Sequence, residues 1–317
     1  MKKLVSMLSV AVCALMLFSC GGDAPKKQVP EKRIKVAVQL YSVRGDLEKD
    51  FYGTLKAVKD MGYEGVEFAG LYGHTPEQVK TWCKELGLTA VSAHVPFNEM
   101  LADMDKVIND YKTIGCEYIA VPWVGPEHQP DGEQYMAFLD DLKILGQQAK
   151  DAGITLLYHN HDFEFKLIDS GMKHKEPGLD FMYAWVPEDL LQTELDLCWV
   201  KYAGYDPVKY ILKYSGRTPV LHFKDYYVEG EQEGTPYELI GDEKATEEAA
   251  KPTFEFRPLG QGVQDIQALL NAADESGCKW IVVEQDQPSM EKTPMECIKM
   301  SVEYLKPMRD ELLKQSK

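Results

Sequence analysis

The chain has 317 residues, of which 44% are hydrophobic and 27% charged, and its formal net charge is −16. This length suits one large α/β domain, and the acidic balance excludes a protein that grips the nucleic-acid backbone through a basic surface. The seven cysteines are scattered without a Cys-x-x-Cys pair, which argues against a disulfide framework and against a thiolate zinc site.

Residues 1–19 have the pattern of a secretory signal peptide. Lys2 and Lys3 precede an apolar run from Leu4 to Phe18, and the run ends just before Cys20. This ending resembles a bacterial lipoprotein signal, in which Cys20 carries the lipid, and the alternative is an ordinary cleaved signal with an incidental cysteine. Residues 20–33 are polar and contain Gly and Pro, so they are predicted to form a lipid-anchored flexible tether.

From residue 34 onward, short apolar segments alternate with longer amphipathic ones. The predicted strands are Ile34–Leu40, Gly65–Phe68, Leu88–His94, Tyr118–Pro122, Ile154–His159, Leu191–Leu195, Val220–Phe223 and Trp280–Glu284. The predicted helices are Leu47–Met61, Pro76–Leu86, Met100–Ile114, Gln134–Ala152, Leu179–Val186, Pro207–Tyr214, Val263–Ser276 and Pro294–Leu313. Eight such units, without a G-x-G-x-x-G turn after the first strand, favour a single closed (β/α)8 TIM barrel over residues 34–317 rather than an open doubly wound sheet. The segment Asp225–Gly260 is read as an insertion.

Polar side chains gather at the carboxyl ends of these strands, where a TIM barrel carries its active site. In chain order they are Gln39, Tyr41, Glu67, His94, Trp123, His159, His161, Asp196, His222 and Glu284. Asp196, His222 and Glu284 close three successive strands and could converge on one ion, and mixed carboxylate and imidazole ligands favour Mn²⁺, Zn²⁺ or Co²⁺ over Ca²⁺. Lys224 shares the strand face of His222 and is expected to face a substrate, whereas Asp225 is expected in the following loop.

The segments YHNHDFEF, ELDLCW, LHFKD, PLGQGVQD and VVEQDQP resemble strand ends of the sugar phosphate isomerase/epimerase superfamily, the xylose isomerase-like TIM barrels. The resemblance spans nearly the whole chain after the signal, and it implies that Asp196, His222 and Glu284 are metal ligands. It also implies that Glu67 and His94 contact either the substrate or the residues that hold the site, and Trp123 offers a face on which a sugar ring could stack.

The chain departs from this family at two positions. The epimerases have Glu-Asn-His at the end of strand five, where this sequence has His159-Asn160-His161, so the fourth metal ligand is either His159 or Glu164. A substrate-contacting histidine of the family is replaced by Trp199.

The resemblance implies a divalent-metal-dependent sugar isomerase or epimerase that acts by enolising a ketose or keto-sugar. Glu284, with His159 or His161, would move the proton next to the carbonyl group. Loss of the strand-five glutamate weakens two-base epimerisation and raises the case for a dehydratase or lyase acting on a keto-glycoside or an inosose-like substrate.

The export signal favours a small free or glycosidic carbohydrate as substrate, because phosphorylated sugars are scarce outside the cytoplasm. The expected location is the bacterial cell envelope, in the periplasm or at the outer membrane, with membrane contact through the lipid anchor only. Coupling to a sugar dehydrogenase would supply the ketone, and the sequence leaves a homo-oligomer open. A non-catalytic sugar-binding lipoprotein is the alternative from another class of function.

Overall fold

The computed structural model describes residues 34–169, 171, 175–229 and 253–315. The predicted signal peptide, the lipidation site Cys20 and the tether of residues 20–33 lie outside these residues. None of the helices in the described part of the chain is both long and apolar enough to cross a membrane.

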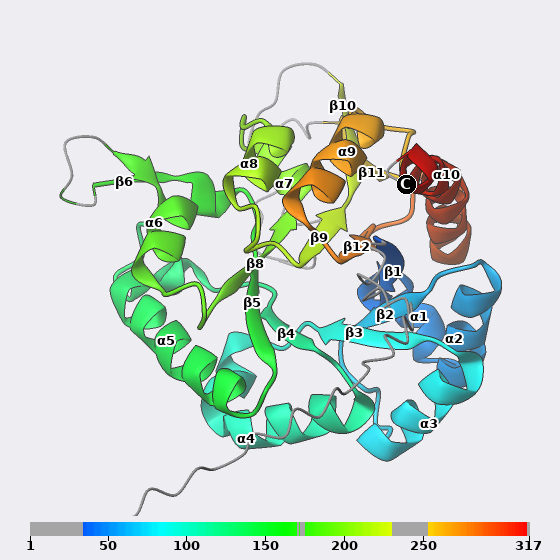
Figure 1. Cartoon of the computed structure of the whole chain (residues 1–317), viewed down its shortest axis with the longest axis horizontal. Coiled ribbons are helices and arrows are strands. Elements are labelled where there is room, and N and C mark those ends of the chain that lie inside the picture. The colour runs from blue at the N-terminus through cyan, green and yellow to red at the C-terminus, as the bar shows by residue number, and fades with distance from the viewer. Residues whose placement is uncertain (1–33, 170, 172–174, 230–252, 316–317) are drawn as a thin grey trace, which may run out of the picture. The chain divides into compact units, whose positions relative to one another are not determined.

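Eight parallel strands form the barrel in the order β3-β2-β1-β12-β9-β8-β5-β4 (Figure 1). A parallel bridge between His94 and Ala120 joins the two ends of this order, so the sheet closes between β3 and β4. The predicted single (β/α)8 barrel is therefore confirmed. Its strands are β1 (Lys35–Gln39), β2 (Gly65–Phe68), β3 (Thr89–Ala93), β4 (Tyr118–Val121), β5 (Thr155–His159), β8 (Gln192–Asp196), β9 (Val220–Phe223) and β12 (Trp280–Val283).

The helices surround the barrel close to the predicted positions. Two differences have local causes: Asp50 accepts a hydrogen bond from the Gly53 N–H and starts a separate helix inside predicted Leu47–Met61, and Asp196 starts a short helix that was not predicted. The α-helices are α1 (Arg44–Leu47), α2 (Phe51–Asp60), α3 (Pro76–Leu86), α4 (Phe97–Ile114), α5 (Tyr135–Asp151), α6 (Gly178–Trp185), α7 (Leu197–Tyr202), α8 (Pro207–Lys213), α9 (Ile266–Ser276) and α10 (Pro294–Gln315). Three short 3-10 helices are η1 (Leu40–Val43), η2 (Pro126–His128) and η3 (Phe163–Phe165).

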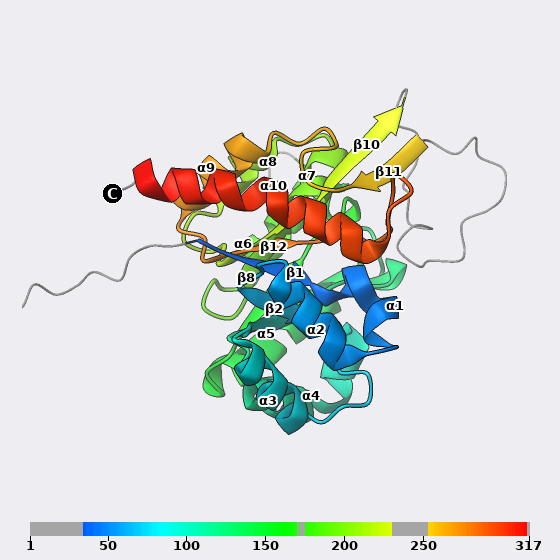
Figure 2. The same ribbon diagram turned by 90° about the vertical axis from the view of Figure 1, so that its right-hand side faces the viewer.

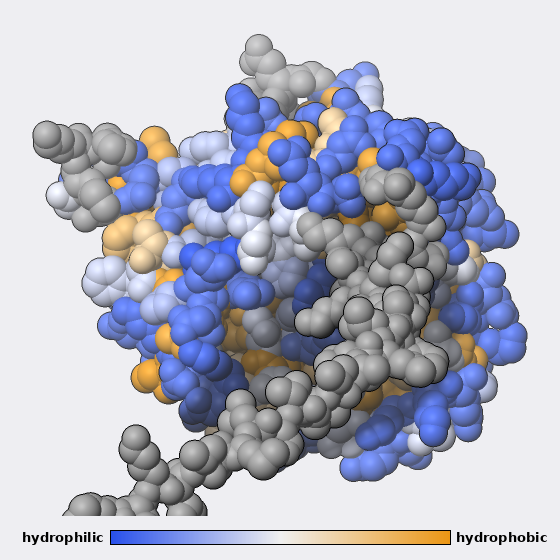
Figure 3. Space-filling model, viewed as in Figure 1, coloured by the Kyte–Doolittle hydropathy of each residue, from blue (hydrophilic) through white to orange (hydrophobic). Residues whose placement is uncertain are grey.

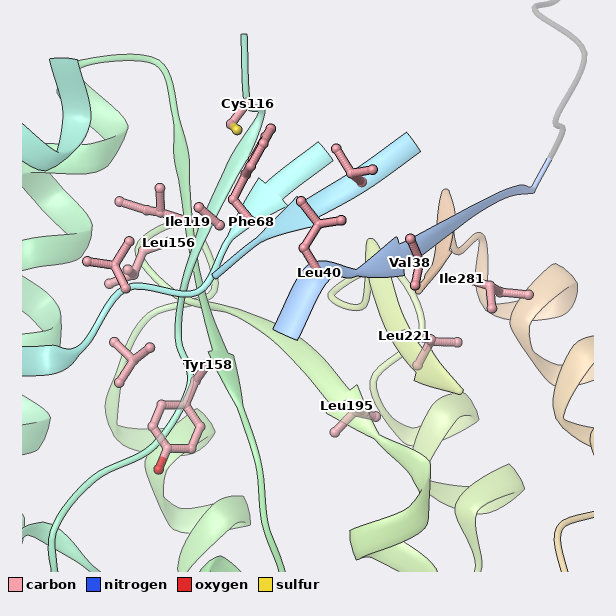
Figure 4. Close-up of a cluster of buried hydrophobic side chains, with 14 of the residues drawn as sticks. Val38, Leu40, Phe68, Cys116, Ile119, Leu156, Tyr158, Leu195, Leu221 and Ile281 are labelled. Atoms are coloured by element: carbon pink, nitrogen blue, oxygen red, sulfur yellow. The ribbon is translucent and has the colours of Figure 1, made fainter. Parts of the chain in front are cut away.

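The main core lies between the sheet and the helices, and every strand of the barrel supplies residues to it. Figure 4 shows part of it, including Val38, Phe68, Ile119, Leu195 and Leu221. Successive side chains of a strand point to opposite faces, so the residues between these point into the barrel. The helices turn polar faces outward, and in Figure 3 the visible surface is largely hydrophilic with small, separate apolar areas.

A second, smaller apolar cluster fills the half of the barrel interior toward the amino ends of the strands. This half is called the lower half below, and the half toward the carboxyl ends is called the upper half. Gly65 makes room there, because a Cβ at this position would lie 2.9 Å from the Trp280 ring and 2.7 Å from Val91. The layer leaves the upper half of the interior to the polar side chains that follow on the same strands. Its members are Ala37, Val91, Tyr118, Ala120, Leu157, Val220, Trp280 and Val282.

The ends of the predicted insertion form an antiparallel hairpin of β10 (Asp225–Glu229) and β11 (Thr253–Arg257). Figure 2 shows it at the same end of the barrel as α1, which follows soon after β1, so the hairpin lies at the carboxyl ends of the strands. A second small hairpin pairs β6 (Leu167–Ile168) with β7 (Glu176–Pro177).

Asp225 was expected in a loop, and that expectation is wrong. Its buried carboxylate accepts hydrogen bonds from the backbone N–H groups of Tyr226, Gly260, Gly262 and Gln264, at 2.9 to 3.1 Å. Only glycine fits at 262, because a Cβ there would lie 2.2 Å from the Asp225 carboxylate. This arrangement, called the Asp225 clasp below, fastens the base of the hairpin to the chain that leads into α9.

Candidate active site

Three neighbouring strands each place two chemically active side chains in the upper barrel interior. The members of each pair are two residues apart, so both point to the same side of their strand. The first residue of each pair lies deeper in the barrel than the second. The pairs are Glu194 and Asp196 from β8, His222 and Lys224 from β9 and its extension, and Glu284 and Asp286 from the end of β12.

Asp196 is held by the start of α7. One carboxylate oxygen, Oδ1, accepts hydrogen bonds from the backbone N–H groups of Cys198 at 2.8 Å and Trp199 at 3.1 Å. Asn160 fixes the backbone of the same residue, since its side-chain oxygen accepts a hydrogen bond from the Asp196 N–H at 3.1 Å. These contacts leave the other oxygen, Oδ2, directed toward the interior, where it lies 3.7 Å from His159 Nε2.

His222 lies between two carboxylates. Its Nδ1 is 2.9 Å from Glu284 Oε2, and its Nε2 is 2.8 Å from Glu67 Oε1. Glu67 is fixed in turn by Gln39, whose amide donates a hydrogen bond at 2.7 Å, and by the hydroxyl of Ser92. The imidazole therefore has both nitrogens engaged and a single orientation.

His94 lies beside the same network, close to the seam where the barrel closes. Its Nε2 is 3.0 Å from Glu67 Oε1 and 2.8 Å from Glu194 Oε2. Its ring stacks on that of His222, with 5.2 Å between centroids and 9° between planes. Carboxylates of β2 and β8 are thereby joined through one imidazole.

Lys224 points into the interior as its strand face predicts. Its Nζ lies 3.0 Å from Asp196 Oδ2, 2.8 Å from Glu284 Oε2 and 2.9 Å from Asp286 Oδ2. The side chain is 1% exposed. A buried ammonium without partners would be very unfavourable, and three carboxylates compensate this one.

The buried charges displace the pKa values of the site in opposite directions. Burial opposes charge on His94, but Glu67 and Glu194 outweigh it and raise its pKa to about 10. Burial, assisted by the negative charge of Glu67, raises the pKa of Glu194 to about 7. Burial would also raise the pKa of Glu284, yet the charges of Lys224 and His222 hold it below its ordinary value. The site therefore combines an ionised carboxylate with a carboxyl group that titrates near neutrality.

The donor set fits a divalent metal ion. Five buried carboxyl groups lie in this group with one lysine and with two histidines, His94 and His222, whose pKa values are raised. The carboxyl groups outnumber these cations, an excess of negative charge that a dication would compensate. Three buried polar atoms in the group, His159 Nδ1, Glu194 Oε1 and Asp196 Oδ2, have no hydrogen bond. In two overlapping sets, one ligand atom of each residue lies within 4.8 Å of the others: His94, His159, Glu194 and His222, and His159, Asp196, His222 and Glu284. Imidazole with carboxylate suits Zn²⁺, Mn²⁺ or Co²⁺.

The structure brings His159, rather than Glu164, to the metal group. Glu164 lies in η3, where it accepts hydrogen bonds from the Tyr158 hydroxyl at 2.6 Å and from the His161 N–H at 2.8 Å. It belongs to neither ligand set. The 3-10 turn folds Glu164 back onto its own strand, so this carboxyl group does not replace the missing glutamate.

His161 and Trp199 lie beside the group without joining the ligand sets. The His161 ring stacks on Phe163 at 5.5 Å and contacts the Trp199 ring at 5.4 Å. Burial and the charge of Lys224 lower the pKa of His161 to about 3, so this imidazole is neutral. Trp199 is fully buried in an aromatic cluster against the hairpin and cannot present a face to a sugar.

A cavity of about 1060 Å³ opens above the metal group. His94, His159 and Glu284 line it, together with His161, Lys224 and Asp286. Trp123, placed by the end of β4, also lines the cavity and is 38% exposed. Tyr41 and Leu71 line it as well. Most ligand sites have this combination of an apolar wall and a few polar groups, and the volume admits a sugar.

The sequence interpretation missed three residues of this site: Glu194, Asp286 and Asn160. The first two have a signal in the sequence, because each lies two positions from a predicted ligand and shares its strand face. The same rule identifies Lys224 from His222. Asn160 gave no such signal, since its role is to tie the ends of β5 and β8 together.

A family model for the xylose isomerase-like TIM barrel matches residues 55–308, and the chain belongs to this family. An inosose dehydratase of Geobacillus kaustophilus is 22% identical over 278 residues, which cover 79% of this chain and 85% of that protein. A crystal structure of a sugar phosphate isomerase/epimerase from Parabacteroides distasonis has a TM-score of 0.66 at 21% identity, over 90% of this chain and 98% of the other. The protein IOLI, whose crystal structure contains a zinc atom, has a TM-score of 0.61 at 15% identity, over 88% and 99%. These relatives include isomerases, epimerases and dehydratases, so the family itself does not select one reaction.

Proposed function

We propose that this protein is a divalent-metal-dependent enzyme that removes a proton next to the ketone of a keto-sugar. The observation that carries the proposal is the buried group of His159, Asp196, His222 and Glu284, because two of its members, His159 and Glu284, line a sugar-sized cavity. A metal held there would act as a Lewis acid that stabilises negative charge on the carbonyl oxygen. The zinc atom in the related IOLI structure supports a metal in barrels of this kind.

Glu284 is the proposed base. It lines the cavity, and the charges of Lys224 and His222 keep it ionised despite its burial. Its carboxylate would take the proton, and the C–H electron pair would form the double bond of an enolate. Return of a proton to the opposite face gives an epimer. Where the α carbon also carries a hydroxyl group, transfer of the hydroxyl proton to the former carbonyl oxygen and return of a proton to the former carbonyl carbon give an isomer. His159 and His161, both neutral, are the candidates for the second proton transfer.

A second outcome, elimination, is favoured by Asp286. Burial raises the pKa of this carboxyl group to about 6 although Lys224 lies 2.9 Å away, and the group lines the cavity. Asp286 could therefore give a proton to a β-hydroxyl or β-alkoxyl group as the enolate expels it. The inosose dehydratase relative supports this dehydratase or lyase reading.

Proton exchange in D₂O tests the proposal. The purified protein would be incubated with Mn²⁺, Zn²⁺ or Co²⁺ and a panel of ketoses, inososes and keto-glycosides, with and without a chelator. Deuterium incorporation at one carbon that stops on chelation is expected, and NMR of the product distinguishes epimer, isomer and elimination. Sugar binding without exchange would contradict the proposal and favour a sugar-binding lipoprotein.

We also propose that the protein is an envelope lipoprotein whose substrate is not phosphorylated. The proposal is supported by the sequence pattern that ends at Cys20. Cells fed a labelled fatty acid should label the wild-type protein and not Cys20→Ala, and the label should separate with the membrane fraction. An equally labelled variant would contradict it.

A further inference from the structure

Three carboxylates surround the Lys224 ammonium. Asp196, Glu284 and Asp286 each place one oxygen within 3.0 Å of Nζ, as ion pairs. The cation is therefore already paired with side chains of β8 and of the chain that follows β12. Although Lys224 lines the cavity, the geometry therefore gives it a task different from the substrate contact that the sequence suggests.

Two aromatic rings enclose the same ammonium on its other sides. The ring centroid of Phe256 lies 5.4 Å from Nζ, and that of Trp199 lies 5.6 Å from it. The two rings are nearly perpendicular, with 87° between their planes. Each presents a negative π face to the cation, an interaction that strengthens when water is excluded, and both rings are buried.

Phe256 belongs to the hairpin rather than to the barrel. It lies on β11, and its backbone carbonyl accepts a hydrogen bond from the Gln285 amide at 3.4 Å. Gln285 immediately precedes Asp286, which is an ion-pair partner of Lys224. Phe256 therefore contacts Lys224 through its ring and Gln285 through its backbone. The hairpin thus contacts Lys224 and the residue that precedes its ion-pair partner Asp286.

We infer that Lys224 is a positioning residue for the carboxylates of β8 and β12, and that the β10–β11 hairpin is part of the active site because its Phe256, with Trp199, fixes that ammonium. Lys224 holds Asp196 and Glu284 from the cavity side, and the two rings prevent it from turning toward solvent. The catalytic consequence rests on the proposed function. The placement of Lys224 by the two rings is independent of the proposed function.

The inference is tested with Phe256→Leu and, as a matched control, Phe254→Leu. Both phenylalanines lie on the same face of β11 and are buried in the same aromatic cluster. Of the two rings, only that of Phe256 lies over Lys224 Nζ. A ¹H–¹⁵N spectrum of the lysine ammonium groups, with Lys224 assigned by its loss in Lys224→Met, reports the placement without any substrate.

In the wild-type protein, the Lys224 signal should exchange slowly and be shifted by the ring currents. Phe256→Leu should lose this shift and broaden the Lys224 signal. Phe256→Tyr should keep the slow exchange and the ring-current shift. Phe254→Leu should also keep both, although its Tm falls about as much as that of Phe256→Leu. With a keto-sugar that exchanges, Phe256→Leu should lower kcat about tenfold with little change in KM, since the rings act through Lys224.

An unshifted Lys224 signal in the wild-type protein, or one equally altered by both leucine variants, would overturn the inference. Equal kcat losses in both variants would do the same. If the signals behave as expected and no keto-sugar exchanges, the placement of Lys224 stands and the proposed function fails.

Discussion

The two halves of the barrel interior come from the same strands and obey opposite physical rules. β9 gives Val220 to the lower layer and His222 to the upper one, and β12 gives Val282 and then Glu284. In the lower layer, each buried side chain contributes favourable transfer from water, about 1.5–3 kcal/mol for a valine or leucine. In the upper layer, burial opposes every charge, and the network only compensates that penalty. A step of two residues along one strand thus leads from a side chain that stabilises the fold to a side chain that can take part in chemistry.

The largest test of this contrast is His222→Ala. His222 belongs to both candidate ligand sets and contacts Glu67 and Glu284, so its loss should abolish tight metal binding and lower the exchange rate at least about a thousandfold. Metal content by mass spectrometry and exchange in D₂O would be measured together. His128→Ala, outside both ligand sets, should keep both. A metal-replete, active His222→Ala protein would refute the assignment.

The converse test lies in the lower layer. Leu157 is fully buried, and Leu157→Ala should lower the free energy of unfolding by about 2–5 kcal/mol because it leaves a cavity. The folded variant should bind metal as the wild-type protein does. Denaturant unfolding and metal titration are the measurements, and a large loss of metal affinity would show that the two layers are coupled.

A buried carboxyl group outside the network sharpens the comparison. Burial raises the pKa of Glu164 from 4.5 to about 8, because no cation compensates it. A raised pKa means that the stabilising contribution is complete below pH 4.5 and is lost as the pH rises through about 8. Glu164→Gln, which mimics the neutral acid, should remove a loss of stability that builds up between pH 4.5 and about 8, at roughly 1.4 kcal/mol per pH unit.

Unfolding at several pH values in the presence of a chelator measures this effect. Asp131→Asn, which alters an exposed carboxylate paired with Lys166, is the control and should leave that pH range unchanged. Identical pH profiles for Glu164→Gln and the wild-type protein would show that Glu164 titrates normally.

The smallest expected effect belongs to Glu194→Gln. The amide keeps the shape of the side chain but removes one buried charge next to His94, so metal affinity should fall about tenfold while the free energy of unfolding changes by less than about 1 kcal/mol. Calorimetric titration with Zn²⁺ and thermal unfolding check the two numbers. A loss of stability without a loss of affinity would assign Glu194 to the scaffold.

Local signals in the sequence were sufficient for most of the fold. The predicted bounds of α3 agree with the structure because Thr75 and Gln78 form a capping box and Gly87 ends the helix in the left-handed region. α7 was missed since its start depends on Asp196, a residue interpreted only as a ligand. At the site, Asp196, His222 and Glu284 do lie together, as the strand order required.

The rest of the site depends on the three-dimensional course of the chain, which the spacing of residues in the sequence does not reveal. His159 and Glu164 are both near strand five, and only the turn Phe163–Phe165 decides which of them faces the barrel interior. Lys224 was placed on the correct face, but its ion pairs with three carboxylates depend on the distances between strands. The contact of Phe256 with Lys224 joins residues 32 positions apart across an insertion, and no periodic pattern predicts it.

The Asp225 clasp makes the segment between Glu229 and Thr253 a part of the chain in which changes of length can be tolerated. Because Asp225 closes the base of the hairpin with four backbone hydrogen bonds, the chain between Glu229 and Thr253 can vary in length at a small entropic penalty. Insertions and deletions there need not disturb β9 or α9. An exchange of this segment would therefore leave Asp196, His222 and Glu284, the candidate metal ligands, in place.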